Sequence, residues 1–510
     1  MAENETPSGS SSLEAQRALR LEKAEKLRER GINPWGNGRK VEHTAAAVKG
    51  RYGDAPVEAI EADETVWSIA GRVMMVRTFG KMAFLVLRDR TGDIQLQLRK
   101  DKLGEEGFSL LKLLDMGDYA AATGRATRTK TGEITVVADE WTILTKSLRP
   151  LPEKWHGLED VEARYRQRYL DLATDLGTRE AFRKRTQLVS YIRRFLDQRG
   201  FLEVETPMMH PLVSGAAAKP FITHHNALDI DLYLRIAPEL YLKRLVVGGF
   251  ERVYEINRNF RNEGLSTRHN PEFTMLEFYL AHATYEDLMD MTEEMVRGAA
   301  EEILGTTKIT YQGHEIDFGG PWKRISMAEA VLESTEGKLK EADLLDPDKL
   351  KAVLLESFQG TDAERAEIDL MDVGSLVGAL FEEHAEHKLV HPTFITQFPT
   401  AISPLARRND QNPDYTDRFE LYCAGREIAN AFSELNDPID QRERFEKQVE
   451  AKKRGAEETM DYDADYIAAL EHGMPPTAGE GIGIDRLAML FTDAASIRDV
   501  ILFPLLKPRS

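Results

Sequence analysis

The stretch from Arg252 to Leu280 carries the side chains best suited to bind a nucleotide. Alternate residues of an extended strand share a face, so Arg261 ends a polar face that begins at Glu255. After the polar loop 262–270, a second strand places Phe273 on a face with charged groups, and its other face is apolar. An arginine neutralises a phosphate and a phenylalanine stacks on a base, whereas unpaired charges are costly to bury in a core. The pattern favours a nucleotide site, and a surface hairpin with salt bridges is the alternative.

Residues 418–437 add four carboxylates and a second polar strand face. Asn430, Phe432 and Glu434 share that face. Glu420 and Glu427 lie on either side of a kink expected at Gly425. Two carboxylates beside a triphosphate are a usual arrangement for Mg²⁺, which prefers oxygen ligands and retains waters. Solvent-exposed glutamates are the alternative, and the spacing alone does not decide between them.

A glycine-rich run, GEGIGIDR at 479–486, precedes an apolar helix expected at 487–491. It lacks both the GxGxxG spacing and the βαβ context of a dinucleotide fingerprint. It offers instead a strand that a ligand can approach closely, followed by Arg486 at a helix N-terminus, where anions are favoured.

In chain order, these segments resemble the signature motifs of class II aminoacyl-tRNA synthetases. The first motif matches GFLEVETP at 200–207, the second FRNE at 260–263 with its following strand, and the third GIGIDR at 481–486. The similarity is greatest to lysyl-tRNA synthetases, because RNFRNEG, RHNPEFTMLE, PFITHHNALD and GREIANAFSELND stand nearly intact. It extends from residue 13 to the end of the chain.

The resemblance implies an enzyme that uses ATP to activate L-lysine as lysyl-adenylate, transfers it to tRNA(Lys), and releases pyrophosphate and AMP. Arg261 would be the catalytic group at the α-phosphate. The implied ATP site comprises Arg261, Glu263, His269, Asn270, Phe273 and Arg486. The implied lysine site comprises Gly215, Glu239, Glu277, Tyr279, Asn430, Phe432, Glu434 and Gly481. The resemblance also implies Mg²⁺ held by Glu420 and Glu427, and a homodimer with Pro207 and its helix at the interface.

The residue types agree with this assignment at the amino-acid end. The ammonium of lysine has three donors and no acceptor, and Glu277, Glu434 and Tyr279 supply acceptors. A pocket for aspartate or asparagine would need a cation or an amide there. Such a pocket strongly rejects analogues that lack the amine. Ornithine is harder to reject, because one methylene is worth only about 1–3 kcal/mol.

Residues 61–150 are expected to form a five-stranded β-barrel of the oligonucleotide-binding (OB) type, with a β-sandwich as the alternative. Ile94, Leu96 and Leu98 alternate with polar residues, and TKTG at 129–132 indicates a hairpin. By resemblance, the anticodon contacts in this region are Arg77, Phe84, Gln95 and Glu133. Without the resemblance, Phe84 would be assigned to the core.

The rest of the chain is expected to be a class II catalytic domain over residues 151–510. Its long alternating runs, interleaved with helices, favour an antiparallel sheet flanked by helices in an α+β fold. We expect a helical insertion at 325–395, a flexible tail over 1–12, and a helix and linker over 13–60. The N-terminal helix would be either a solvated surface helix or one that binds tRNA or a partner.

Composition excludes several classes of protein. With 42% hydrophobic and 30% charged residues, the chain is neither disordered nor fibrous. It shows no membrane span and no signal peptide, and one cysteine, Cys423, suits a reducing, cytoplasmic location. The net charge of −19 argues against non-specific nucleic-acid binding, so a tRNA ligand requires a local basic face.

Two departures from the family pattern leave every named catalytic group in place. Ser214 stands where a glycine is common, and Lys219 replaces a common arginine. Glu480 stands where an apolar residue is more usual, so it would either alter the local field or point to solvent. Two other functions stay open at this point: a lysyl ligase that modifies a protein, and a catalytically inactive tRNA-binding or regulatory relative.

Overall fold

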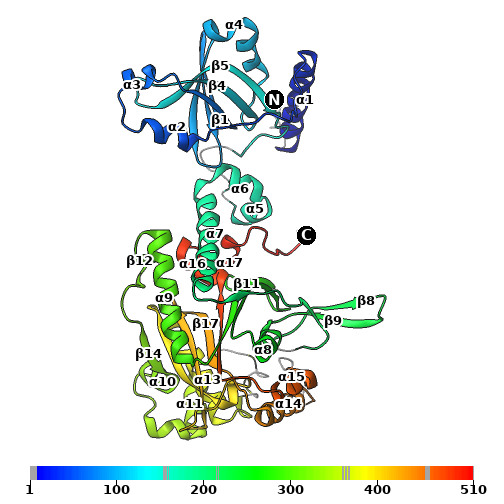
Figure 1. Cartoon of the computed structure of the whole chain (residues 1–510), viewed down its shortest axis with the longest axis vertical. Coiled ribbons are helices and arrows are strands. Elements are labelled where there is room, and N and C mark those ends of the chain that lie inside the picture. Colours follow the sequence, from blue (N-terminus) through cyan, green and yellow to red (C-terminus); the bar gives the residue numbers. More distant parts are fainter. Residues whose placement is uncertain are drawn as a thin grey trace, which may run out of the picture. The chain divides into compact units, whose positions relative to one another are not determined.

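The computed structural model describes residues 9–152, 158, 160–213, 215, 218–358, 361, 365, 368–453 and 460–508. The chain forms two compact units, residues 1–159 and residues 160–510 (Figure 1). Helix α1 begins at Gly9, inside the segment expected to be a tail, and residues 1–8 lie outside the described residues.

Unit 1 is built on a closed five-stranded barrel, which excludes the β-sandwich. Its strands, in barrel order, are β1 (Val66–Phe79), β2 (Met82–Arg88), β3 (Asp93–Arg99), β5 (Ile134–Thr145) and β4 (Tyr119–Arg128). Ile94, Leu96 and Leu98 are fully buried, which confirms the period-two pattern. A Cβ at Gly124 would collide with the carbonyl of Val137, so glycine permits the close approach of β4 and β5 at a bulge.

The helices of unit 1 are α1 (Gly9–Glu29), α2 (Ala45–Tyr52), α3 (Val57–Ala62) and α4 (Lys100–Ser109), with a 3₁₀ turn at Leu110–Leu113. Two side chains of α1 hold it to the barrel. Arg20 donates to the carbonyl of Ser147 at 2.9 Å, and Lys23 forms an ion pair with Asp115 at 2.6 Å. The surface of α1 that faces away from these contacts is exposed.

Unit 2 is organised around an eight-stranded sheet, antiparallel except for its outermost strand pair at each edge. Its strands, in sheet order, are β14 (Lys323–Ser326), β15 (Thr393–Pro399), β16 (Tyr415–Cys423), β17 (Arg426–Ser433), β18 (Thr477–Gly483), β11 (Glu272–Ala281), β10 (Arg252–Phe260) and β6 (Leu202–Glu203). With the barrel of unit 1, this sheet confirms the α+β fold class.

Helices cover the two faces of this sheet unequally. On one face, α7 (Leu176–Asp197), α9 (Tyr285–Leu304) and α16 (Ile484–Thr492) enclose the largest apolar core, which includes Leu276 and Phe278 of β11. On the other face, α8 (Glu239–Val247), α14 (Pro438–Lys453) and α15 (Ala464–Glu471) pack on Val253 and Tyr279. Further along that second face, polar side chains of the central strands line a cavity.

The segment between β14 and β15 is helical and has a core of its own. It contains α10 (Met327–Ser334), α11 (Pro347–Ser357) and α13 (Val373–His384), with 3₁₀ turns at Glu341–Leu345 and Glu386–Lys388. Leu350, Leu380 and Phe381 are buried together there with Ile395 of β15. The described part of this segment is therefore mainly helical.

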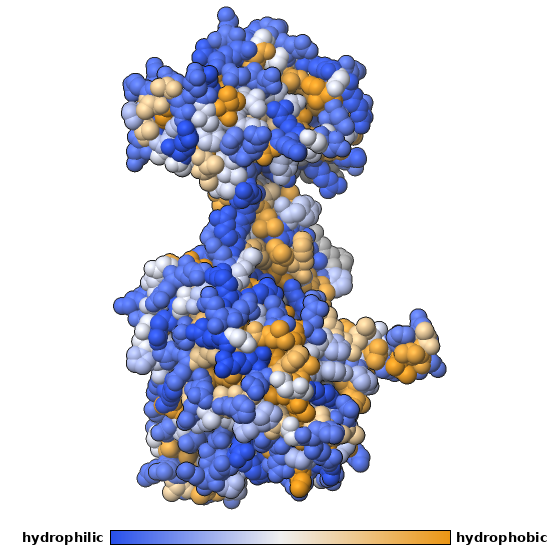
Figure 2. Space-filling model, viewed as in Figure 1, coloured by the Kyte–Doolittle hydropathy of each residue, from blue (hydrophilic) through white to orange (hydrophobic). Residues whose placement is uncertain are grey.

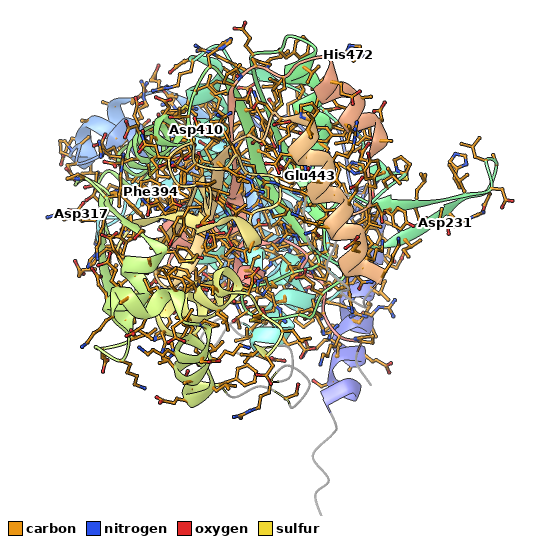
Figure 3. The ribbon with its side chains drawn as sticks, turned by 90° about the horizontal axis from the view of Figure 1, so that it is seen from below. Asp231, Asp317, Phe394, Asp410, Glu443 and His472 are labelled. Atoms are coloured by element: carbon orange, nitrogen blue, oxygen red, sulfur yellow. The ribbon has the colours of Figure 1, made fainter. Side chains whose placement is uncertain are left out.

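The short elements of unit 2 are α5 (Val161–Arg166), α6 (Arg168–Thr174), β7 (Met209–His210), β8 (Ile222–His225), β9 (Ile230–Leu234), β12 (Lys308–Tyr311), β13 (His314–Asp317), α17 (Ile497–Val500) and a 3₁₀ turn at Thr400–Ile402. The hairpin of β8 and β9, which carries Asp231, projects from the body of unit 2 (Figures 1 and 3). Among the described helices of the chain, none combines the length and the apolar character that crossing a bilayer requires.

One carboxyl group lies within the main core. Glu480 of β18 is only 1% exposed, and the Thr292 hydroxyl of α9 lies 2.7 Å from each of its oxygens. Glu480 pairs directly with Phe278 on the neighbouring strand β11, so both side chains lie on the same face of the sheet. The Glu480 side chain therefore points into the core and not to solvent. Burial raises the pKa of Glu480 to about 8.

We expect Glu480→Gln to stabilise the protein increasingly as pH rises. Because the folded-state pKa is raised, the folded protein retains a proton that the unfolded chain loses from pH 4.5 upward. The stability of the wild-type protein relative to the variant should therefore fall between pH 4.5 and about 8 and then level off. A tenfold difference in proton affinity between the folded and unfolded states corresponds to about 1.4 kcal/mol. Melting temperatures at pH 5, 7 and 9 measure this trend.

Glu301→Gln is the matched control, since Glu301 is an exposed carboxylate of α9. It should show no pH-dependent difference from the wild-type protein. If the melting temperatures of the wild-type protein and of Glu480→Gln differed by the same amount at all three pH values, a protonated buried Glu480 would be contradicted.

Candidate active site

A single cavity on the second face of the unit 2 sheet brings most of the predicted site residues together. Predicted nucleotide-site residues in its lining are Arg261, Glu263, His269, Asn270, Phe273 and Arg486. Predicted amino-acid-site residues in its lining are Gly215, Glu239, Glu277, Tyr279, Asn430, Phe432, Glu434 and Gly481. Glu427 also lines the cavity, whereas Glu420 does not. Segments that lie far apart in the sequence therefore meet at one place.

Strand alternation explains why these residues meet. On β11, Phe273, Glu277 and Tyr279 share the face opposite the apolar core. The neighbouring strand β18 pairs Gly481 with Glu277 and Gly479 with Tyr279. A Cβ at position 479 would collide with Oε1 of Glu434 and with the Tyr279 ring. The glycines of β18 thus leave the space that the larger side chains of β11 and β17 occupy.

One end of the cavity is acidic and buried. Glu239, Glu277 and Glu434 are 8%, 5% and 2% exposed, and the Tyr279 hydroxyl donates to Oε1 of Glu277 at 2.7 Å. Burial, reinforced by repulsion from Glu239, raises the pKa of Glu277 to about 8. Burial also raises the pKa of Glu434, although Lys243 lowers it in part. These carboxylates converge on the cavity and do not point into bulk water.

The other end of the cavity combines cations with an aromatic ring. The Arg261 guanidinium carbon lies 5.1 Å from the centroid of Phe273, and its buried Nε has no hydrogen-bond partner among the described residues. Arg486 donates to Oε2 of Glu427 at 3.1 Å, and its guanidinium lies 3.4 Å from Nε2 of His269. Burial and the nearby Arg486 lower the pKa of His269. This end can hold an anion beside a flat ring.

Glu420 lies beside the cavity in a network of its own. Arg418 and the Tyr422 hydroxyl each donate to one of its oxygens at 2.5 Å. Burial raises the pKa of Glu420 to about 7, Arg418 lowers it in part, and repulsion from Glu427 raises it further. A divalent cation would relieve that repulsion, and carboxylate oxygens are suitable ligands. The described residues contain no group of three or more metal-ligating side chains, so these two carboxylates would hold a metal only with phosphates or waters.

The barrel of unit 1 gathers three of the four predicted anticodon residues on its outer surface. Arg77 of β1 pairs directly with Phe84 of β2, and Gln95 lies on the adjacent strand β3. Phe84 is only partly buried and meets the exposed ring of Phe79 edge-on, with centroids 6.3 Å apart. Its side chain is therefore not in the barrel core. Residues 61–150 carry nearly equal numbers of basic and acidic side chains, so the acidic excess of the chain lies elsewhere.

Gln95 and the fourth predicted anticodon residue, Glu133, have partners within unit 1. Gln95 accepts a hydrogen bond from Thr135 at 2.8 Å. Glu133 precedes β5 and forms an ion pair with Lys49 at 3.1 Å. Thr135 is fully buried, whereas Gln95 is partly exposed and Glu133 is exposed.

Comparisons with known proteins agree with this geometry. Residues 160–507 match the family model described as tRNA synthetases class II (D, K and N), and residues 67–144 match the model of an OB-fold nucleic acid binding domain. The lysine–tRNA ligase of Anaeromyxobacter sp. (strain K) is 56% identical over 500 residues, covering 96% of this chain and 97% of that protein. The lysine–tRNA ligase of Carboxydothermus hydrogenoformans is 56% identical over 491 residues, covering 96% and 98%. The chain belongs to the class II lysyl-tRNA synthetase family.

One residue of the cavity lining, Asp485, and one residue behind it, Lys243, were not predicted from the sequence. Asp485 accepts hydrogen bonds from the Thr274 backbone, at 2.7 Å, and from Arg185, so it joins the third motif to the second. Its position in the first turn of α16 was the available signal. Lys243, buried behind the acidic end, gave no signal beyond its i,i+4 spacing from Glu239. Of the two motif departures near residue 215, Ser214 lies outside the described residues, and the carbonyl of Lys219 accepts a hydrogen bond from the Asn262 amide at 2.8 Å.

We expect Gly479→Ala to destabilise the folded protein by about 1–3 kcal/mol, the usual cost of overpacking a filled site. The new methyl group would displace the Glu434 carboxylate and the Tyr279 ring. The free energy of unfolding from urea titration measures this loss. Gly483→Ala is the matched control on the same strand, because its Cβ would meet other atoms only at 3.6 Å. Equal stability of the two variants would contradict the packing described here.

Proposed function

We propose that this chain uses ATP to attach L-lysine to tRNA(Lys), through a lysyl-adenylate intermediate. The observation that carries the proposal is the pairing of two environments in one cavity. A buried acidic end faces an end built from Arg261, Arg486 and Phe273. An amino acid with a cationic side chain fits the first end, and a nucleoside triphosphate fits the second.

The acidic end would bind the lysine substrate. Two of its carboxylates, Glu277 and Glu434, and the Tyr279 hydroxyl would accept hydrogen bonds from the side-chain ammonium. Glu239 would receive the α-ammonium group. The cavity-facing glycines, Gly215 and Gly481, would leave room for the substrate backbone, with Asn430 and Phe432 along its side chain.

The cationic end would position ATP for adenylate formation. Phe273 would stack under the adenine, with Glu263, His269 and Asn270 around the nucleotide and Arg486 at the γ-phosphate. A carboxylate oxygen of lysine attacks the α-phosphorus, and pyrophosphate leaves. The tRNA 3′-terminal hydroxyl then attacks the adenylate carbonyl, and AMP leaves. No side chain acts as a nucleophile, so positioning and charge neutralisation by Arg261 carry the first step.

Glu420 and Glu427 would hold Mg²⁺ together with the phosphates of ATP. When bound, the ion neutralises phosphate charge and orients the leaving pyrophosphate. Glu427 also accepts a hydrogen bond from Arg486 at 3.1 Å, so the ion and this arginine would lie beside the same phosphates. The proposed substrates ATP, lysine and tRNA also support a cytoplasmic location.

The barrel supports tRNA over a protein as the acceptor of the lysyl group. Arg77, Phe84 and Gln95 lie on its outer surface, where an aromatic ring and an amide can stack on a base and read its edge. We propose that these residues, with Glu133, contact the anticodon.

Pyrophosphate exchange into ATP, measured separately with each amino acid, tests the proposed activation step. Lysine alone should support rapid exchange, and the activated lysine should then charge tRNA(Lys) but not a protein. We expect Arg261→Ala to slow exchange at least about 100-fold, since one donor to developing transition-state charge is worth about that much. Arg252→Ala, an exposed arginine of the same hairpin, is the control and should retain exchange. Unaltered exchange in Arg261→Ala would remove the α-phosphate role.

We also propose that the protein is a homodimer, supported by an exposed apolar patch on unit 2. The patch comprises Met209, Ile222, Leu228 and Ile230 of the small sheet formed by β7, β9 and β8 and the turn between β8 and β9. Apolar surface is visible on the projecting β8–β9 hairpin in Figure 2. Ile222 and Leu228 are 65% and 64% exposed in the single chain, and a clustered patch of this kind marks an interaction site.

We expect Ile222→Glu combined with Leu228→Glu to convert the protein to a monomer. Two charges buried at a symmetric interface would remain unpaired in both copies. Light scattering after size exclusion measures the mass. Leu370→Glu, at an 87% exposed leucine outside the patch, should leave the mass unchanged. A dimer that survives the double substitution would place the interface elsewhere.

A further inference from the structure

Lys243 is a fully buried cation that the proposed reaction does not use. It lies on α8, one turn after Glu239, and its side chain is 0% exposed. Its ammonium forms ion pairs with Glu239, at 2.6 Å, and with Oε2 of Glu434. Among the described residues that line the cavity, Lys243 is absent, so its ammonium lies behind the two carboxylates and not among the groups that touch a ligand.

The contacts of Lys243 leave other oxygens of the same carboxylates free. Oε1 of Glu434 has no hydrogen-bond partner among the described residues and lies over the glycine strand, next to Gly479. Oε1 of Glu239 is the atom that accepts from Lys243, and Glu239 also lines the cavity. The ammonium therefore anchors one side of each carboxylate while the other side remains available to a substrate.

The surroundings of Lys243 show why a cation is needed there. The groups facing it are Glu239 of its own helix, Glu434 after β17, the Phe432 ring of β17 at 5.4 Å, Glu277 of β11, and Tyr466 of α15. Among the described residues, Lys243 is the cation that forms ion pairs with two of the three carboxylates here, Glu239 and Glu434. Unpaired buried carboxylates take up protons instead of remaining charged. Without Lys243, the acidic end would gain protons and lose acceptors.

We propose that Lys243 is a positioning residue of the lysine site, whose ammonium holds the Glu239 and Glu434 carboxylates in place and orients them toward the substrate. This inference rests on the proposed lysine site. The carboxylates that bind the substrate ammonium would thus already be held in place by the ammonium of Lys243. The number of protons that the site releases on binding lysine is then set by Lys243.

Proton release on lysine binding is the readout that distinguishes positioning from a merely structural role. Calorimetric titration of the full-length protein with L-lysine, in two buffers of different ionisation enthalpy at pH 7, counts these protons. The wild-type protein should release protons, because burial raises the pKa of Glu277 to about 8 and also raises the pKa of Glu434, and an ammonium ligand requires their charged forms. Lys243→Met should release more protons than the wild-type protein, since the loss of this cation raises the pKa of Glu434 further.

The affinity of the variant should change in a specific direction with pH. At pH 7, Lys243→Met should bind lysine at least about tenfold more weakly, because a buried carboxyl group that loses its cation has a higher pKa and must lose its proton before it can bind an ammonium. At pH 9 the difference in lysine affinity between the variant and the wild-type protein should be smaller. If Lys243 acted only by repelling the substrate ammonium, its removal would strengthen lysine binding at pH 7. That result would overturn the proposal. ATP binding should be unchanged in either case.

Two further variants separate this role from stability. Arg244→Met removes the ion pairs of the next residue in α8, with Asp463 and Asp465, but leaves the acidic end intact. It should lower the melting temperature without changing the proton count. If Lys243→Met fails to fold, Lys243→Gln removes the same charge while keeping a hydrogen-bond donor. The expected change in proton release is the same for this variant.

The outcomes also distinguish this inference from the proposed function. A wild-type protein that neither binds lysine nor supports lysine-dependent pyrophosphate exchange would remove the proposed function itself. A wild-type protein that does both, beside a folded Lys243 variant with the same proton count and affinity, would remove only the role of Lys243.

Discussion

Burying several carboxylates in one cavity is the constraint around which this enzyme is arranged. A lone buried carboxylate neutralises itself by taking up a proton, so an acidic pocket persists only if cations and donors balance it. The Tyr279 hydroxyl binds Glu277, and the Lys243 ammonium binds Glu239 and Glu434. The same cost makes the pocket selective, because a ligand without an ammonium would leave these charges unpaired.

The sheet of unit 2 separates structure from chemistry by the direction of its side chains. Residues such as Leu276 and Phe278 enter the core beneath α7, α9 and α16, while their neighbours Glu277 and Tyr279 enter the cavity. Neighbouring residues of one strand thus have unrelated surroundings. Glu480 shows how strict this separation is: its side chain lies in the core, although the strand that carries it borders the cavity.

The parts of the structure that follow from local periodicity could be predicted from the sequence. Alternation places Phe273 and Glu277 on a common face, and the short strands of residues 61–150 close into a barrel. What the pattern does not carry is the partner of each side chain across the fold. Two positions depend on segments far away in sequence. Lys243 is buried against Glu434, and Glu480 lies in the core against Thr292.

Strand β18 gives the cavity a floor made of main chain. With glycine at 479, 481 and 483, this strand contributes only peptide groups at these positions, and neighbouring side chains fill part of the space above them. Point substitutions can raise this floor but cannot give it a new chemical preference without also filling the space. Changes of substrate choice during evolution would therefore arise in the walls, on β11, β17 and α8, while the floor stays constant.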